Sequence, residues 1–259
     1  MYAEERQQAI ASLVIAKGRA SVTELAQAYD VTTETVRRDL GVLDRAGVLR
    51  RVHGGAVPAR ALRVVESGVG EREATRADHK DAIGIAAAEF VPIHGGTVLL
   101  DAGTTTGRVA AHLPTDRELV VVTNSVPIAA RLAGMPSVTL QVLGGRVRGL
   151  TQAAVGEQVL RVLDTLRVDI AFIGTNGISI RHGLSTPDVD EAAAKRAMVR
   201  AANYVVVVTD SSKVGHEDMV SFAPITSVDT LITDSEIAEA DREEYLSQGV
   251  EVICTGRSA

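Results

Sequence analysis

The sequence predicts an α/β protein: a small N-terminal domain of helices and a hairpin, followed by a larger domain with a mostly parallel sheet. Two observations support this fold class. Three short helical patterns and a glycine hairpin occupy the first 57 residues, whereas runs rich in Val, Ile and Leu alternate with helical patterns from about residue 81 onward. A chain of 259 residues is long enough for two domains with separate cores.

Helical periodicity and capping signals predict three helices in the first domain. The first covers residues 3–17. The second starts at Ser21, which has capping-box spacing to Glu24. Thr32 is the expected N-cap of the third helix, which runs to about Arg45.

A hairpin follows the third helix. Two β-like runs, residues 48–52 and 56–57, are joined through His53, Gly54 and Gly55, and the glycines suit a tight turn. We therefore expect three parts: a first domain over residues 1–57, a charged linker containing Pro and Gly over residues 58–76, and a second domain over residues 77–259.

The second domain is predicted to contain a parallel sheet covered by helices on both faces, because its strands are almost continuously apolar. The expected strands are residues 97–102, 118–123, 137–143, 168–174, 204–209, 229–233 and 250–254. The expected helices are residues 105–113, 126–133, 156–163, 188–202 and 235–247.

Composition excludes several classes of protein. With no Trp and 3% aromatic residues, the chain lacks stacking platforms for single-stranded nucleic acid. Its one cysteine, Cys254, cannot form an intrachain disulfide, which favours a reducing compartment. The N-terminus has no signal-peptide pattern, and no apolar run approaches the roughly 20 residues of a membrane span. We therefore expect a cytoplasmic protein with no membrane partner.

The net charge of −6 is unevenly distributed. Residues 1–60 carry 9 Lys and Arg against 7 Asp and Glu, whereas the remaining residues carry 18 against 26. An electrostatic footprint for nucleic acid must therefore be a local patch in the first 60 residues.

The third predicted helix has an apolar stripe and a polar outer side. At 100° per residue, Val36, Leu40 and Leu43 share one side, and Glu34 and Arg38 lie opposite. Short polar residues at the start of a helix, with arginines behind them, suit a helix that enters the major groove. An ordinary amphipathic helix with a solvated face explains the arginines alone. The preceding tight turn and the following basic hairpin favour a winged helix-turn-helix.

The stretch "SVTELAQAYDVTTETVRRDLGVLDRAGVLRRVHGGAV" resembles the N-terminal domain of the DeoR family of bacterial transcriptional repressors, most specifically in "TVRRDL" and "RRVHGGA". The resemblance covers essentially all of residues 1–57 and implies binding to double-stranded operator DNA. The implied readers of the major groove are Thr33, Glu34, Arg37 and Arg38. The implied phosphate contacts are Ser21, Thr35, Arg51 and His53. Asp39 is expected to orient a neighbouring arginine or to cap a local bond.

Several polar, glycine-containing loops lie at the expected carboxyl ends of strands, where open α/β sheets bind ligands. In the first, Asp101 ends a strand and Gly103, Thr104 and Thr105 open a helix, whose free N–H groups suit an anion. A helix cap with extra threonines is the alternative. The other loops contain Asn124, Gly144, Gly145, Asn176 and Lys213. Together they predict a polar pocket for a small phosphorylated or hydroxylated molecule.

Glu191 and Lys195 lie four residues apart on a predicted helix. One interpretation is that the two residues form an exposed ion pair. Alternatively, Lys195 lies in the pocket as a cation for phosphate. The six histidines are scattered and the cysteine has no partner, so we expect no metal site and no cofactor.

The second domain also resembles the effector domain of the DeoR family over about residues 75–255, a domain similar in fold to sugar-phosphate isomerases and CoA-transferases. The resemblance implies a phosphorylated sugar effector. It implies an effector site formed by Asp101, Gly103, Thr104, Thr105, Asn124, Gly144, Gly145, Asn176, Lys195 and Lys213. The stretches "LGGRVRGLTQAAVGE" and "GLSTPDVDEAAAKRAM" resemble actinobacterial repressors of fructose and phosphotransferase genes, a resemblance that implies fructose 1-phosphate as the first candidate effector.

Two functions therefore compete. The leading one is a repressor, acting as a homo-oligomer (dimer or tetramer), that a sugar phosphate releases from DNA. The alternative is a sugar-phosphate isomerase or CoA-transferase-like enzyme with a regulatory DNA-binding domain. An enzyme needs an acid/base pair. Asp101, Asp210 and Glu191 are candidates, but their spacing singles out no pair, so we expect no catalytic residues.

Overall fold

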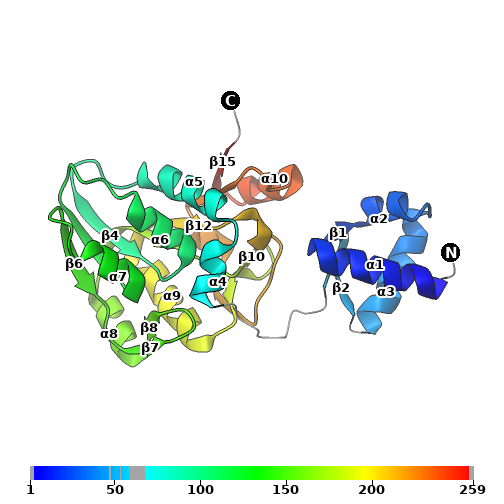
Figure 1. Ribbon diagram of the computed structural model, residues 1–259, viewed down its shortest axis with the longest axis horizontal. Helices are drawn as coiled ribbons and strands as arrows, with labels where there is room; N and C mark the ends of the chain where they lie inside the picture. The colour runs from blue at the N-terminus through cyan, green and yellow to red at the C-terminus, as the bar shows by residue number, and fades with distance from the viewer. Residues whose placement is uncertain (1–2, 47, 53, 59–67, 257–259) are drawn as a thin grey trace. The chain divides into compact units, whose positions relative to one another are not determined.

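The computed structural model describes residues 3–46, 48–52, 54–58 and 68–256, which fall into two compact units, residues 1–64 and 65–259 (Figure 1). The first unit contains three helices and a three-stranded antiparallel sheet of order β1-β3-β2. Its helices are α1 (Ala3–Lys17), α2 (Val22–Ala28) and α3 (Thr33–Arg45). Its strands are β1 (Ala20–Ser21), β2 (Leu49–Val52) and β3 (Gly55–Pro58).

Local signals fix the helix starts in this unit. The Ser21 hydroxyl accepts a hydrogen bond from Glu24 N, and the Glu24 carboxylate accepts one from Ser21 N, so the predicted capping box is present. Thr32 caps α3 by accepting from Thr35 N at 3.2 Å. The predicted stripe of α3 is buried, and it packs in a core with residues of the other elements. That core contains Ile10, Val14, Leu25, Val36, Leu40, Leu43, Leu49 and Ala56.

The second unit is built on a seven-stranded sheet of order β15-β14-β12-β9-β4-β5-β6, in which every neighbouring pair is parallel. All seven predicted strands are present, which confirms the predicted fold class. The strands are β4 (Gly96–Leu100), β5 (Leu119–Thr123), β6 (Val138–Val142), β9 (Val168–Ile173), β12 (Ala202–Val208), β14 (Thr230–Asp234) and β15 (Glu251–Thr255).

Helices cover both faces of this sheet. One face packs against α5, α6 and α7, and the other against α8, α9 and α10 (Figure 1). These helices are α5 (Ala77–Ala88), α6 (Thr104–Ala111), α7 (Val126–Leu132), α8 (Glu157–Thr165), α9 (Val189–Ala201) and α10 (Glu239–Ser247).

Several short elements have no counterpart in the sequence prediction. They are β1, β7 (Arg146–Arg148), β8 (Ala153–Val155), β10 (Gly177–Ser179), β11 (Gly183–Thr186) and β13 (Val220–Ala223), with the 3-10 turns η1 (Ser211–Lys213) and η2 (Ile225–Ser227). The longer helix α5 was not predicted either. The helix α4 (Val69–Ala74) lies inside the segment 58–76 that we expected to be a linker, and it belongs to the second unit.

Candidate functional site

The outer side of α3 presents the residues expected to read DNA. Thr33, Glu34, Arg37 and Arg38 are exposed, while the stripe on the opposite side is buried. The Arg37 guanidinium lies 3.5 Å from the Glu34 carboxylate, one turn earlier on the helix. The helix therefore offers a polar surface with two arginines to a partner outside the chain.

Asp39 does not act as expected. It is buried and accepts hydrogen bonds from Arg6 Nε at 2.6 Å and Gln7 Nε2 at 2.9 Å, both on α1. The prediction that Asp39 orients a neighbouring arginine of its own helix was wrong. Its partners are on α1, more than 30 residues away, and the contact fixes the position of α3 against that helix.

The expected phosphate contacts are only partly described. The Ser21 and Thr35 hydroxyls lie at the starts of α2 and α3, and Thr35 Oγ1 is 2.9 Å from Thr32 Oγ1. The backbone of Arg51 lies in β2, but its side chain is outside what the structure describes, and His53 lies outside the described residues altogether.

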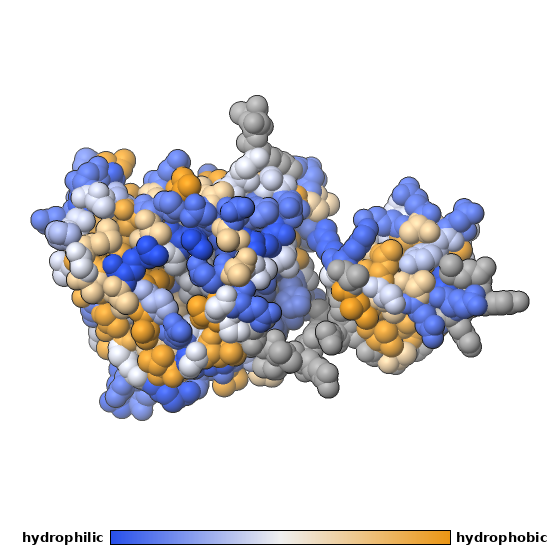
Figure 2. Space-filling view, viewed as in Figure 1, coloured by the Kyte–Doolittle hydropathy of each residue, from blue (hydrophilic) through white to orange (hydrophobic). Residues whose placement is uncertain are grey.

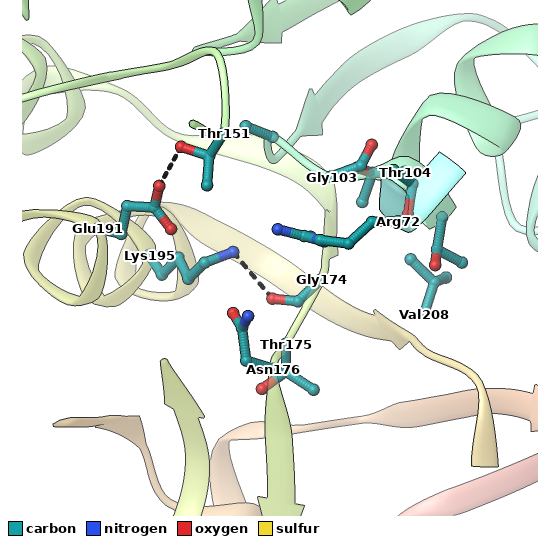
Figure 3. Close-up of a pocket in the computed structure, with 13 residues that line it drawn as sticks. Arg72, Gly103, Thr104, Thr151, Gly174, Thr175, Asn176, Glu191, Lys195 and Val208 are labelled. Atoms are coloured by element: carbon teal, nitrogen blue, oxygen red, sulfur yellow. Dashed lines mark hydrogen bonds between the residues drawn. The ribbon is translucent and has the colours of Figure 1, made fainter. Parts of the chain in front are cut away.

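In the second unit, a pocket lies at the carboxyl ends of the central strands (Figure 3); its space of about 410 Å³ includes open solvent at its mouth. The loops after β4 and β9 and the end of β12 form its floor, and α4 and α9 contribute side chains. The lining residues are Arg72, Ala102, Gly103, Thr104, Thr105, Thr106, Thr151, Gly174, Thr175, Asn176, Glu191, Lys195 and Val208.

Lys195 is buried beneath this pocket and forms an ion pair. Its Nζ donates to Asp101 Oδ2 and, at 2.9 Å, to the carbonyl of Gly174. Burial raises the pKa of the Asp101 carboxyl, and the Lys195 charge opposes that rise. The pair joins α9 to the ends of β4 and β9, so the positive charge of Lys195 is already neutralised within the chain.

Glu191 is also buried and has partners of its own. It accepts hydrogen bonds from Arg148 on β7 and from Thr151 Oγ1, which lines the pocket (Figure 3). The possibility of an exposed Glu191–Lys195 pair is therefore wrong, because both side chains are only 5% exposed and each binds a different residue.

One wall of the pocket carries donors without partners. Gly103 precedes α6 and offers no side-chain cap, so the first N–H groups of the helix face the loop. Thr104 and Thr105 are 5% and 8% exposed, and neither hydroxyl has a hydrogen-bond partner among the described residues. The Arg72 side chain extends from α4 into the same pocket (Figure 3). These groups suit a bound anion.

The structure brings some predicted effector residues together and not others. Gly103, Thr104, Thr105, Asn176 and Lys195 line the pocket, and Asp101 lies directly behind Lys195. The sequence did not indicate Arg72 or Thr151. Arg72 follows a segment without apolar periodicity, and Thr151 lies in a short hairpin loop between β7 and β8.

Five predicted effector residues do not line this pocket: Asp101, which lies behind Lys195, and Asn124, Gly144, Gly145 and Lys213. Asn124 is buried; its side chain accepts from Ala102 N and donates to Ala154 O, both at 3.0 Å, so it holds the loop before α6. Gly145 has φ of +146° and lies so close to the Val155 carbonyl that a Cβ would be 2.9 Å from it. Lys213 lies in η1.

A charged cluster lies near the ends of β12 and β14. His79, Asp234 and Glu236 bring potential ligand atoms within 4.8 Å, a grouping that the scattered histidines of the sequence did not suggest. Arg76 donates to Asp234 Oδ1 at 3.2 Å and to Glu236 Oε2 at 2.8 Å. Because the guanidinium already pairs with both carboxylates, the cluster is an ion-pair network.

Comparison with known proteins identifies both units. Residues 6–60 match the DeoR-like helix-turn-helix domain, and residues 75–235 match the DeoR C terminal sensor domain. Across the part of the chain that the structure describes, no helix is both long and apolar enough to span a bilayer.

Full-length relatives are similar over nearly the whole chain. The HTH-type transcriptional regulator GlpR of Haloferax volcanii is 37% identical over 98% of either chain. The lactose phosphotransferase system repressor of Streptococcus mutans is 33% identical over 98% of this chain and 100% of its own. The glycerol-3-phosphate regulon repressor of Escherichia coli is 32% identical over 89% of this chain and 90% of its own.

Among solved structures, the ribose 5-phosphate isomerase of Methanocaldococcus jannaschii is similar over 54% of this chain and 55% of its own, with 19% identity and a TM-score of 0.40. A likeness this low carries no conclusion about the chemistry of the chain. The two domain matches and the full-length relatives show the family: the chain belongs to the DeoR family of transcriptional regulators.

Proposed function

We propose that this protein represses sugar-utilisation genes and that a phosphorylated sugar, bound in the second unit, releases it from DNA. The observation that carries the effector class is the donor-rich wall of the pocket. The free N–H groups of α6, the hydroxyls of Thr104 and Thr105 and the Arg72 guanidinium all face one space without an acceptor in the described chain. A phosphate group supplies those acceptors.

The opposite side of the pocket suits the hydroxyl groups of a sugar. Glu191, Thr151 and Asn176 line it, and they offer both acceptors and donors. Glu191 is already paired with Arg148, and Thr151 and Asn176 are uncharged, so this end offers a second phosphate no free cation among the described residues. The arrangement therefore favours a ligand with one phosphate over a bisphosphate. Fructose 1-phosphate is our first candidate, with fructose 6-phosphate second and fructose 1,6-bisphosphate third.

The names of two relatives support this effector class. One is a glycerol-3-phosphate regulon repressor and another a lactose phosphotransferase system repressor. In the proposed repressor, α3 enters the major groove with Thr33, Glu34, Arg37 and Arg38, and Ser21, Thr35, Arg51 and His53 contact phosphates. A homo-oligomer, dimer or tetramer, places two such helices on half-sites about 10 bp apart or a multiple of that.

The alternative of an isomerase or CoA-transferase-like enzyme needs a free acid/base pair in the pocket. The two buried carboxylates there are engaged, Asp101 with Lys195 and Glu191 with Arg148 and Thr151. We therefore propose that the pocket binds its ligand without converting it.

A thermal-shift screen of the full chain against sugar phosphates tests the effector class, because a ligand that binds only the folded state raises the apparent melting temperature. We expect hexose monophosphates to raise the melting temperature and the unphosphorylated sugars to leave it unchanged. The Thr104→Val/Thr105→Val double variant should lose most of the shift. If no sugar phosphate stabilises the wild type, or if one is turned over, the proposed effector role is wrong.

A further inference from the structure

The charged groups of the pocket are almost all neutralised within the chain. Lys195 is paired with Asp101, and Glu191 is paired with Arg148, which also lies 3.3 Å from Asp188. Arg72 differs. Its guanidinium lines the pocket and forms no ion pair or hydrogen bond with any residue that the structure describes. The positive charge available to a ligand is therefore on α4.

The helix that carries Arg72 is held by few contacts. It has six residues, none of them buried, and Gly68 gives it no side-chain cap. Three polar contacts hold its C-terminal end: Lys80 Nζ donates to the carbonyl of Arg72 at 2.5 Å and to that of the C-cap Thr75 at 2.7 Å, and Glu73 pairs with Arg108 of α6 at 2.5 Å. An element with so little buried apolar surface separates from its domain at low free-energy cost.

The beginning of α4 also touches the far wall of the pocket. Val69 N donates to the carbonyl of Leu150 at 3.0 Å, and the next residue, Thr151, lines the pocket and donates to Glu191. A ligand between Arg72 and Thr151 therefore bridges α4 and the β7–β8 loop, the two elements that this backbone hydrogen bond already joins.

The helix α4 follows the residues that connect the two units along the chain. The last described strand of the first unit, β3, ends at Pro58, and α4 begins at Val69, so α4 is the first described element of the second unit. Whatever fixes α4 against the pocket also fixes the point at which the chain enters the second unit.

We propose that Arg72 is the anion contact through which the effector docks α4 onto the pocket, and that this docking transmits occupancy toward the DNA-binding unit. The inference rests on the proposed effector site and adds the element that couples it to DNA binding. The effector acts only through its different affinity for the docked and undocked states. A ligand that binds the pocket without engaging Arg72 therefore binds but does not release DNA.

The test compares the full-length wild type with Arg72→Gln, Arg72→Lys and Arg161→Gln. Arg161 is the control, since it is an exposed arginine on α8 that is paired with Glu157 and does not line the pocket. Three quantities are measured: affinity for fructose 1-phosphate and for inorganic phosphate by calorimetry, amide exchange over residues 68–75 with and without ligand, and the ligand-induced change in affinity for the DNA upstream of the protein's own gene.

We expect Arg72→Gln to lose at least about tenfold in affinity for both probes, as for a charge-assisted hydrogen bond, with Arg72→Lys between it and the wild type. Ligand should protect residues 68–75 in the wild type and in Arg161→Gln. At saturating fructose 1-phosphate, the release of DNA should be smaller for Arg72→Gln than for the wild type.

The outcomes separate this inference from the proposed function. If the wild type binds neither fructose 1-phosphate nor another sugar phosphate, the effector class is wrong. If the wild type binds a sugar phosphate and Arg72→Gln binds it equally well, the role of Arg72 is overturned while the effector class stands. Unchanged exchange over residues 68–75 in liganded wild type overturns the docking of α4, and this result does not depend on whether any variant folds.

Discussion

At the level of single residues, the second unit contains two kinds of buried polar group. The buried charged side chains around its pocket are paired with opposite charges, whereas two threonine hydroxyls of the pocket have no hydrogen-bond partner among the described residues. Lys195, Asp101 and Glu191 are each at most 5% exposed, and each is bound to an opposite charge. Burying a charge without a partner is very costly, so these pairs are required wherever the charges are buried. The hydroxyls of Thr104 and Thr105 are neutral, so leaving them without a partner costs less than leaving a buried charge unpaired.

Asp234, at the end of β14, gives a prediction about pH. Burial favours the neutral form, but hydrogen bonds from Ser211 N and Glu236 N and the charge of Arg76 outweigh burial and lower the pKa of Asp234 below its ordinary value. A carboxyl whose pKa is lower in the folded state stabilises the protein above its unfolded pKa of about 3.9, and this stabilisation is lost as the pH falls through the folded pKa.

The Asp234→Asn variant measures this contribution. We expect urea unfolding at pH 7 to show the variant clearly less stable than the wild type. The difference should be smaller at pH 3, below the unfolded pKa of about 3.9, because there the carboxyl of the unfolded wild type has largely taken up its proton. A difference of the same size at both pH values would mean that the charge of Asp234 contributes nothing.

At the scale of elements, two helices pack unusually closely. A Cβ added to Gly84 on α5 would lie 2.7 Å from Arg108 Cβ and 2.8 Å from the backbone carbon of Arg108 on α6, whereas one added to Gly107 of α6 would meet nothing within 4 Å. Since α6 supplies the donors of the pocket, its contact with α5 fixes where those donors lie.

The two glycines form a matched pair for measurement, because both lie inside helices. Gly84→Ala should lower the free energy of unfolding by about 1–3 kcal/mol, as expected for overpacking. Gly107→Ala should raise it by about 0.5–1 kcal/mol through the better helix propensity of alanine. Thermal unfolding of the second unit distinguishes the two signs, and stabilisation by both substitutions would show that α5 and α6 are not in tight contact.

The sequence predicts the elements that have strong local signals. The seven strands of the sheet are apolar runs, and the capping box at Ser21 and the stripe of α3 can be found from spacing alone. Contacts between distant segments cannot be found in that way. Nothing local pairs Asp39 with Arg6, and nothing in the charged segment before residue 76 indicates that Arg72 faces a pocket.

Glycine loops are a second case in which local signals fall short. The pattern at Gly144 and Gly145 is typical of a ligand loop, yet the close approach of Gly145 to Val155 explains the glycine through the β7–β8 hairpin. Asn124 shows the same limit, because its amide is occupied by two backbone groups. Strand ends indicate where a pocket lies, but not which polar groups face it.

At the scale of the whole molecule, the chain assigns its two tasks to two units with different charge. The first 60 residues carry a small excess of Lys and Arg, and the remainder carries an excess of Asp and Glu. The negative net charge is therefore compatible with DNA binding, because the excess of acidic residues belongs to the unit that holds the pocket. In the proposed function, effector and DNA bind different units, so the response is a coupling between two sites.

The most direct test of the proposed repressor function is the equilibrium affinity of the full chain for the DNA upstream of its own gene. It is measured at several salt concentrations, with and without fructose 1-phosphate. We expect affinity to fall steeply with salt, to fall again with effector, and to be lost in Arg38→Ala but kept in Arg161→Ala. Equal affinity of wild type and Arg38→Ala, or binding that neither salt nor any sugar phosphate weakens, would contradict the proposed repressor function.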